Sequence, residues 1–220
     1  MKDIVIVGKG GFAKETKWII DRINHKTMKW NFLGYIDKTA GEVGIIGDDR
    51  FILNINEKLS VVLAIGNPGV RNDIYLKYRQ NKFLEFPNII DPSVKMSERV
   101  NLGEGNIICA DNIMTVDVSL GSFNIINLGC TVGHDVRIGD FNTVNPCTNI
   151  SGNVIMKEFI EIGTGAKIIQ GITIEKGVIA GAGSVIISDI PAETTIVGVP
   201  AKVIKNHERD KRNEQNDYNS

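Results

Sequence analysis

The residues with the clearest capacity for chemistry lie in one short segment, Gly133-His134-Asp135. An imidazole that titrates near neutral pH accepts a proton from an amine or a hydroxyl, which is the task of a general base. A neighbouring carboxylate orients such a ring and stabilises its cation, although residues adjacent in sequence need not face each other. The segment therefore indicates a general base, with an ordinary surface histidine as the alternative. We expect the other two histidines, His25 and His207, to be solvated surface residues.

A second segment with chemical potential is Gly8-x-Gly10-x-x-Ala13, which follows an apolar run at residues 2–7 and precedes helical spacing at residues 12–24. Glycines at such a turn let backbone N–H groups approach a phosphate, and a helix N-terminus favours negative charge. Three interpretations compete: a structural tight turn, an NAD site, and a site for a nucleoside diphosphate. A full dinucleotide fold needs a second half-sheet, for which residues 1–90 are too short, so we favour the nucleoside diphosphate.

Other residues fall at the ends of neighbouring predicted strands and join this second site. Asp37 ends the apolar run at residues 32–36, where its carboxylate would accept hydrogen bonds from the base. The Gly66-Asn67 turn and Arg71 follow the run at residues 59–65. Because the carboxyl ends of parallel strands meet at one edge of a sheet, we expect these residues to lie together.

The position of His134 depends on a six-residue repeat that runs through residues 100–189. Fourteen of the fifteen positions in one column hold a large aliphatic residue, and the exception is Ala180. The column consists of Leu102, Ile108, Met114, Leu120, Ile126, Val132, Ile138, Val144, Ile150, Met156, Ile162, Ile168, Ile174, Ala180 and Ile186. A fixed short period is typical of a solenoid, and a hexad fits one short strand with a tight corner. A β-sandwich is excluded because its strands alternate with period 2 and its loops vary in length.

Three hexads make one triangular coil of 18 residues with the aliphatic column inside. Glycine often follows the aliphatic residue, as at Gly103 and Gly121, and we expect these glycines to supply positive φ at the corners. His134 lies two residues past the inward Val132, which predicts a side chain that points outward from a corner. Gly152 lies one coil further in the same register, and our hypothesis is that its missing Cβ leaves room for a thioester and a free N–H for its oxygen.

The first 90 residues predict a different architecture. Apolar runs at residues 3–7, 32–36, 59–65 and 83–86 alternate with helical spacing at residues 12–24 and 67–80. Asn67 is a suitable N-cap, and Pro68 fits the first turn of the second helix. This order predicts a small parallel sheet with flanking helices.

Size and charge exclude several classes of protein. The 220 residues have a net charge of −1, which gives no basic surface for nucleic acid or anionic lipid. No apolar run reaches the roughly 18 residues of a membrane span, and the N-terminus has no pattern of a signal peptide. The three cysteines are odd in number and form no CxxC pair, so we expect reduced thiols and a cytoplasmic protein.

These segments together resemble the sugar O- and N-acyltransferases of the sialic acid O-acetyltransferase and bacillosamine-pathway N-acetyltransferase type. The resemblance covers residues 1 to about 205 and rests on Ile6-Val-Gly-Lys-Gly-Gly-Phe12, Gly34-Tyr-Ile-Asp37, Ala64-Ile-Gly-Asn67, residues 133–141, Ser151-Gly-Asn-Val154 and Val197-Gly-Val-Pro-Ala-Lys202. Members of this family pair a small Rossmann-like α/β domain with an all-β left-handed parallel β-helix. The resemblance implies a homotrimer that binds acetyl-CoA in the groove between neighbouring β-helices, without a metal.

The resemblance also implies roles for individual residues. His134 is the base, Asp135 its carboxylate neighbour, and Asn127 a position near the reacting group. Acetyl-CoA is implied to contact Gly152, Thr164, Ala182 and Lys202, and the nucleotide to contact Gly10, Gly11, Phe12, Asp37, Gly66 and Asn67. In one departure, Thr143 stands where the bacillosamine enzyme has a second histidine, which leaves a contact to the acetyl group and the identity of the acceptor open.

The resulting hypothesis is an acetyl-CoA-dependent N-acetyltransferase that acts on a nucleotide-linked 4-amino-4,6-dideoxy sugar for surface polysaccharide or glycan biosynthesis. The first alternative is O-acetylation of sialic acid or a capsular sugar, and the second is a non-catalytic scaffold that binds a nucleotide-sugar. The predicted division is a Rossmann-like domain at 1–90, a β-helix at 91–192, a C-terminal cap at 193–205 and a disordered tail at 206–220.

Overall fold

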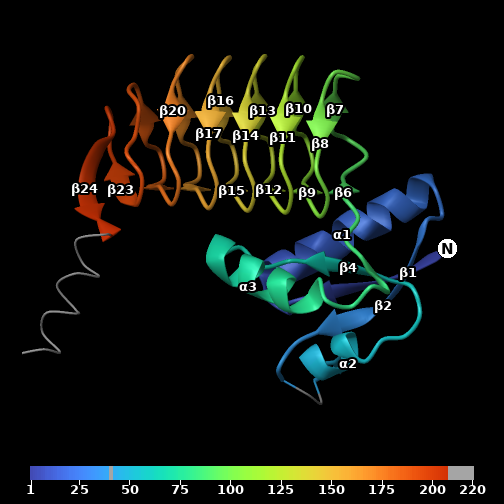
Figure 1. Ribbon diagram of the computed structural model, residues 1–220. Coiled ribbons are helices and arrows are strands. Elements are labelled where there is room, and N and C mark those ends of the chain that lie inside the picture. Colours follow the sequence, from blue (N-terminus) through green and yellow to red (C-terminus); the bar gives the residue numbers. More distant parts are fainter. Residues whose placement is uncertain (40–41, 208–220) are drawn as a thin grey trace, which may run out of the picture.

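The computed structural model describes residues 1–39 and 42–207, which form an α/β domain followed by a parallel β-helix (Figure 1). The α/β domain has one five-stranded parallel sheet in the order β3-β2-β1-β4-β5. Its strands are β1 (Lys2–Val7), β2 (Trp30–Ile36), β3 (Ile45–Gly47), β4 (Leu59–Leu63) and β5 (Leu84–Glu85). Its helices are α1 (Gly11–Lys26), α2 (Asp49–Leu53) and α3 (Pro68–Tyr78).

The central strands of this sheet consist mostly of buried residues. The last four residues of β1 and all of β4 are buried, as expected for central strands that are covered on both faces. Asn67 caps α3 by accepting a hydrogen bond from Val70 N, and Pro68 opens the helix, as predicted. Strand β3 and helix α2 were not predicted from the sequence. Asp48 caps α2 by accepting from the backbone N–H groups of Arg50 and Phe51.

The β-helix has three sheets, which we call faces I, II and III, and their coil strands are parallel. Face I contains β6 (Ile89–Ile90), β9 (Ile107–Ile108), β12 (Ile125–Ile126), β15 (Thr143–Val144), β18 (Glu161–Ile162), β21 (Ile179–Ala180), β23 (Thr194–Val197) and β24 (Lys202–Asn206). Face II contains β7 (Lys95–Met96), β10 (Ile113–Met114), β13 (Thr131–Val132), β16 (Asn149–Ile150), β19 (Lys167–Ile168) and β22 (Val185–Ile186). Face III contains β8 (Asn101–Leu102), β11 (Ser119–Leu120), β14 (Arg137–Ile138), β17 (Ile155–Met156) and β20 (Thr173–Ile174).

The strands repeat with the predicted register. Thr131 pairs with Asn149 and Asn149 with Lys167, so each coil is 18 residues long. The inward column from Ile108 to Ile186 forms one continuous buried core. The corners between the faces form three edges, which we call the I/II edge (residues 127–130 and their equivalents), the II/III edge (133–136) and the III/I edge (139–142).

The expectation that the glycines after the aliphatic residues supply positive φ was wrong. Positive φ occurs three places after each inward residue from Leu102 to Ala180, as at Gly105 (69°) and Asp135 (59°), and not at the glycines that directly follow the aliphatic residues. Those glycines allow neighbouring coils to approach. A Cβ on Gly121 would lie 2.8 Å from the carbonyl carbon of Gly139 in the next coil. The glycine column therefore fulfils a steric requirement between coils.

The α/β domain packs on face I and on the III/I edge. Ile107 and Ile125, which point outward from face I, share a core with α1 and β1, and Cys109 of the I/II edge joins the same core. On the III/I edge, Phe123 stacks on Phe141 with ring centroids 5.1 Å apart, and Phe141 stacks on Phe159 at 5.6 Å. Tyr75 of α3 contacts the first of these rings at 4.2 Å. These aromatic contacts fix the α/β domain against one side of the β-helix.

The C-terminal segment closes the last coil. Strand β24 pairs antiparallel with β23. Asn206, which we assigned to a disordered tail, is the last residue of β24, and the half-buried His207 donates its backbone N–H to Glu193 O (2.8 Å) and contacts Thr195 Oγ1 through Nε2 (2.9 Å). Both residues belong to the cap because they pair with this hairpin. The remainder of the predicted tail, 208–220, lies outside the described residues.

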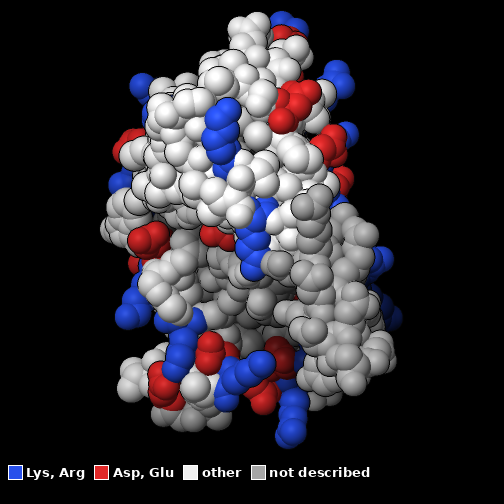
Figure 2. Space-filling model, turned by 90° about the vertical axis from the view of Figure 1, so that its left-hand side faces the viewer, with Lys and Arg blue, Asp and Glu red and all other residues white. Residues whose placement is uncertain are grey.

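Two surface properties agree with the composition. Within residues 1–39 and 42–207, the helices lack the length and apolar character that a membrane span requires. On the face shown in Figure 2, acidic and basic side chains of the described residues are interspersed rather than gathered by sign.

Candidate active site

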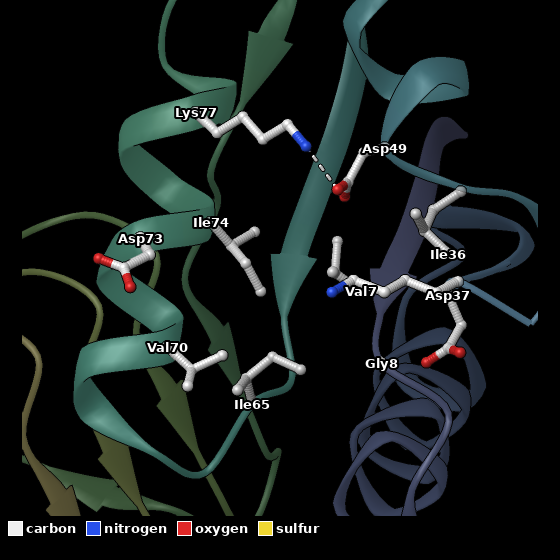
Figure 3. A pocket seen from close by; sticks show the side chains of 11 residues that line it. Val7, Gly8, Ile36, Asp37, Asp49, Ile65, Val70, Asp73, Ile74 and Lys77 are labelled. Carbon is white, nitrogen blue, oxygen red and sulfur yellow. Dashed lines mark hydrogen bonds and ion pairs between the residues drawn. The ribbon is translucent and has the colours of Figure 1, made fainter.

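A cavity of about 450 Å³ opens at the carboxyl ends of β1, β2 and β4. Its walls are apolar and its rim is charged (Figure 3). The apolar residues are Val7, Ile36, Ile65, Val70 and Ile74, and the charged ones are Asp37, Lys38, Asp49, Asp73 and Lys77. A cavity of this size with a few polar groups suits a small organic ligand. Its position at the strand ends is the usual ligand site of an open parallel sheet.

The polar groups of this pocket hold one another in place. Lys77 Nζ lies 2.6 Å from Asp49 Oδ2, and the Tyr78 hydroxyl donates to Asp49 Oδ1 at 2.6 Å. Burial alone would raise the pKa of Asp49, but the hydrogen bonds from Lys77 and Tyr78 outweigh it and hold the pKa below its usual range. Burial and the bond to Asp49 raise the pKa of Tyr78. The sequence did not predict that Asp49, Lys77 and Tyr78 interact at this pocket. The spacing of Val70, Ile74 and Lys77 on one helical face was the available signal for Lys77.

The predicted phosphate-binding turn lines the same pocket. Gly8 has a φ of 104°, and a Cβ there would lie 3.0 Å from Ile65 Cδ1, so the turn and the loop after β4 are in close contact. Gly10 is the N-cap of α1 and Gly11 its first residue, with no acidic side chain in the first turn. A Cβ on either would meet nothing within 4 Å. Open space above a helix N-terminus is suited to an anionic group.

The remaining predicted residues of this site have distinct environments. Asp37 lies in the pocket beside the Gly8 turn, where its Oδ1 accepts from Thr39 N (3.2 Å) and Thr39 Oγ1 (2.9 Å). Phe12 is half-buried and packs against the core that α1 and β1 share, so its ring supports the turn. Gly66 borders open space, and Asn67 caps α3.

Arg71 requires a correction. Its side chain is only 1% exposed and lies between α3 and the β-helix. All five of its N–H donors are engaged: Nε with Phe123 O, Nη1 with the carbonyls of Ile65 and Gly66, and Nη2 with Asn142 O and Thr143 Oγ1. Burial lowers the pKa of Arg71 to about 9, which leaves it charged at neutral pH. Because no donor remains, the side chain does not bind a nucleotide directly.

Thr143 belongs to the same buried cluster. It is 4% exposed, and its Oγ1 donates to Gly66 O at 2.6 Å while it accepts from Arg71. The residue that stands in place of a second histidine is thus engaged with the loop after β4.

His134 lies at the II/III edge immediately after β13. Its side chain is 53% exposed, and Nδ1 lies 2.8 Å from Asp135 Oδ2. Asp135 adopts a φ of 59°, and its backbone N–H donates to Val116 O in the preceding coil. The corner therefore presents an outward imidazole that is paired with its neighbouring carboxylate. In the tautomer that donates Nδ1–H to Asp135, Nε2 carries the lone pair that can accept a proton.

Gly152 lies directly under this ring. A Cβ at Gly152 would overlap Nε2 of His134 and lie 2.5 Å from its Cε1. The missing side chain therefore makes room for the imidazole itself, which differs from the thioester of our hypothesis. The Gly152 N–H donates to no acceptor in residues 1–39 and 42–207, and Gly152 itself is buried under the ring.

The other predicted residues lie elsewhere on the β-helix. Asn127, Thr164 and Ala182 occupy the I/II edge, and Lys202 lies in β24. Asn127 is half-buried, and its Oδ1 accepts from Leu128 N at 2.8 Å. Face II separates this edge from His134. One chain therefore brings His134, Asp135 and Gly152 together but leaves Asn127, Thr164 and Ala182 on another edge.

Comparisons with known proteins agree with this architecture. Residues 3–78 match the model of the PglD N-terminal domain family. The acetyltransferase domain of PglB from Neisseria gonorrhoeae FA1090 is 30% identical, with coverage of 93% of this chain and 100% of that chain and a TM-score of 0.84. The chain belongs to the hexapeptide-repeat sugar N-acetyltransferase family. No curated protein matched the sequence.

Two further solved structures have the same architecture. PerB from Caulobacter crescentus, in complex with CoA and GDP-perosamine, is 31% identical over 93% of this chain and 98% of that chain, with a TM-score of 0.86. WeeI from Acinetobacter baumannii AYE is 26% identical over 93% of this chain and 100% of that chain, with a TM-score of 0.82. The predicted Rossmann-like domain and left-handed parallel β-helix are confirmed. Membership of the family also confirms an acetyl-CoA-dependent sugar acetyltransferase.

Proposed function

We propose that this enzyme transfers the acetyl group of acetyl-CoA to the amino group of a nucleotide-linked 4-amino-4,6-dideoxy sugar. The main support is that one chain combines a pocket beside a glycine turn with an exposed His134–Asp135 pair on a β-helix edge. PerB, with a similar fold, was solved with CoA and a nucleotide-linked amino sugar, GDP-perosamine. Cys109, Cys130 and Cys147 are unpaired, which supports a cytoplasmic reaction in surface glycan synthesis.

In this proposal the α/β domain binds the nucleotide. Asp37 accepts hydrogen bonds from the base in the apolar pocket, and the diphosphate lies at Gly10 and Gly11, where the N-terminus of α1 favours negative charge. The linked sugar then extends away from the pocket toward the β-helix. Binding both substrates together replaces a bimolecular encounter with an oriented one, which accounts for a large share of the acceleration.

The proposed chemical step is direct acyl transfer. The sugar nitrogen attacks the thioester carbonyl, His134 Nε2 accepts the proton of the amine, and the carbon–sulfur bond breaks to release CoA. Asp135 holds the imidazole through Nδ1 and stabilises the cation that forms. The free N–H of Gly152, under the His134 ring, donates to the developing oxyanion.

We also propose that the site is completed in a homotrimer. His134 and Gly152 lie on the II/III edge, while Asn127, Thr164 and Ala182 lie on the I/II edge. In a cyclic trimer, one edge of each subunit faces a different edge of the next, which brings these two sets into one groove. Acetyl-CoA then lies between two β-helices, with Asn127 near the reacting group and Lys202 near the far end of the coenzyme.

The test is an acetylation assay with acetyl-CoA and a panel of acceptors. The panel contains 4-amino-4,6-dideoxy sugars linked to UDP, GDP and dTDP, together with free sialic acid. We expect release of CoA and an N-acetylated product with one of the nucleotide-linked amino sugars. Acetylation of a sialic acid hydroxyl instead would overturn N-acetylation, and nucleotide binding without any transfer would indicate a non-catalytic scaffold.

A further inference from the structure

Arg71 is a buried cation without a carboxylate in ion-pair contact, although the nearby charge of Glu161 favours its charged form. Among the described residues no acidic oxygen lies within ion-pair distance of it, and its five donors bind four backbone carbonyls and the Thr143 hydroxyl. Burying a charge is costly unless every donor is satisfied, and an apolar residue of similar size often stabilises such a position better. An arginine here therefore points to a requirement beyond packing.

The carbonyls that Arg71 binds set the orientation of the loop after β4. Its Nη1 binds Ile65 O and Gly66 O, and Gly66 O also accepts from Thr143 Oγ1. In a trans peptide the C=O and the following N–H point in opposite directions. The N–H groups of Gly66 and Asn67 are therefore directed away from Arg71 and the β-helix.

These two N–H groups are free to bind a ligand. They donate to no acceptor in the parts of the chain that the structure describes. Gly66 borders open space, and Ile65 contacts Gly8 of the glycine turn. Consecutive backbone N–H groups with one orientation form a concave site for an anion. Such a site, directly after Ile65, which contacts the Gly8 turn, suits a phosphate of a nucleoside diphosphate.

We propose that Arg71 is a positioning residue for the diphosphate of the nucleotide-sugar, an inference that rests on the function proposed above. Arg71 holds the carbonyls of Ile65 and Gly66 against the β-helix, and thereby presents the opposite N–H groups to the diphosphate. Thr143 supports the same orientation from β15. The β-helix thus helps to build the nucleotide site through a residue that touches no substrate.

The experiment measures nucleotide binding by the full chain with isothermal titration calorimetry. Wild type is titrated with UDP, GDP and dTDP, and the tightest of the three is compared with its nucleoside. The same pair is then titrated into Arg71→Met, Arg71→Lys and Thr143→Val. Arg22→Met is the matched control, because Arg22 also joins the α/β domain to the β-helix, through Asp91, with Nε 2.6 Å from Oδ2.

We expect Arg71→Met to weaken diphosphate binding by roughly 10- to 100-fold, the value of one charge-assisted hydrogen bond, and to change nucleoside binding by less than about threefold. Arg71→Lys and Thr143→Val show smaller losses in the same direction. The KM for the nucleotide-sugar rises while that for acetyl-CoA does not. Arg22→Met lowers the melting temperature and leaves diphosphate affinity unchanged.

The outcomes separate this inference from the proposed function. Unchanged diphosphate affinity in the Arg71 variants, or an equal loss for nucleoside and diphosphate, overturns the positioning role alone. If Arg71→Met does not fold, Arg71→Lys and Thr143→Val give the same decision. If wild type binds none of the three diphosphates, the proposed function fails and the inference fails with it.

Discussion

The proposed nucleotide pocket and the His134 edge are built in opposite ways. The pocket is enclosed by three strand ends and α3, and its charged groups are fixed by internal contacts such as Lys77–Asp49. His134 is half exposed and has one side-chain partner, Asp135. One chain therefore encloses the proposed nucleotide pocket on several sides but presents the proposed base on an open edge.

Their positions differ as well. The α/β domain packs on face I, and the II/III edge is the corner of the triangular coil opposite that face. Figure 1 shows the α/β domain beside β6, β9, β12 and β15, away from β13 and β14. If the pocket binds the nucleotide as proposed, the linked sugar lies closer to a histidine of a neighbouring chain than to the one in its own chain, which is the structural argument for the proposed oligomer.

The largest expected effect is the loss of His134. His134→Ala removes the proposed base, so kcat should fall by roughly 10²–10⁴-fold, the usual contribution of a positioned base. Since the side chain is 53% exposed, the melting temperature should not change. The measurement is steady-state kinetics with the acceptor found in the panel assay. A kcat within about tenfold of wild type would refute this role.

The second prediction tests whether the two regions come from different chains. Gly10→Asp places a carboxylate where the diphosphate is expected, in open space and at an ordinary φ of −68°, so the variant should fold without binding nucleotide. Oligomers made only of Gly10→Asp chains, or only of His134→Ala chains, should lack activity. Hybrid trimers from a 1:1 mixture should regain about a quarter of wild-type activity. With random assembly, half of the pockets are intact and half of the neighbouring chains carry His134, so about a quarter of the sites combine both.

The control for this experiment is each variant refolded with itself, which should stay inactive. If the mixture also stays inactive although both subunits are found in one oligomer, the pocket and the histidine of one site belong to the same chain.

The third prediction concerns the ring of His134. Gly152→Ala introduces a methyl group that overlaps the imidazole, so the ring must move and kcat should fall by roughly 10- to 100-fold. The double variant with His134→Ala is the control. If Gly152→Ala acts only by moving the imidazole, adding it to His134→Ala should not lower kcat further. Additive losses would show that Gly152 acts separately, for instance through its N–H.

The β-helix was predictable because its period fixes every side chain. Counting from Val132 placed His134 outside and Gly152 one coil away, and both positions are observed. The pairing of His134 with Asp135 was not determined, because it depends on the positive φ at Asp135. The period placed positive φ at the wrong glycines, since it does not distinguish a strained corner from a close approach between coils.

The α/β domain was less predictable because its short elements and their contacts depend on tertiary packing. Strand β3 has three residues, too few for a pattern, so Asp49 gave no signal. Arg71 was assigned to the nucleotide because spacing along α3 does not show which side of the helix faces the β-helix. The role of Thr143 stayed open for the same reason, because the sequence does not show what its side chain contacts. The contacts of Arg71 with Thr143 and of Thr143 with Gly66 join residues more than 70 positions apart in the sequence.

The smallest predicted effect concerns the Arg22–Asp91 contact, which joins the two regions. The Asp91 side chain is fully covered and accepts from Arg22 and Ser93. Burial alone would raise its pKa, but these hydrogen bonds outweigh it and hold the pKa below the usual range. A depressed carboxylate pKa stabilises the fold above the unfolded-state value near 4, and this contribution is lost as pH falls through the folded-state value.

Asp91→Asn should therefore lower the free energy of unfolding at pH 7 by about 1–3 kcal/mol, the value of hydrogen bonds to a charged group. Its stability should also depend less on pH than that of wild type below about pH 4. Denaturant unfolding at pH 7 and at pH 3 measures both effects. Asp21→Asn is the control, because it breaks a half-exposed helix pair with Lys17 and should cost less than about 0.5 kcal/mol. Equal losses for the two variants would mean that Asp91 contributes no more to stability than a surface pair, and that the aromatic contacts and Arg71 hold the two regions together.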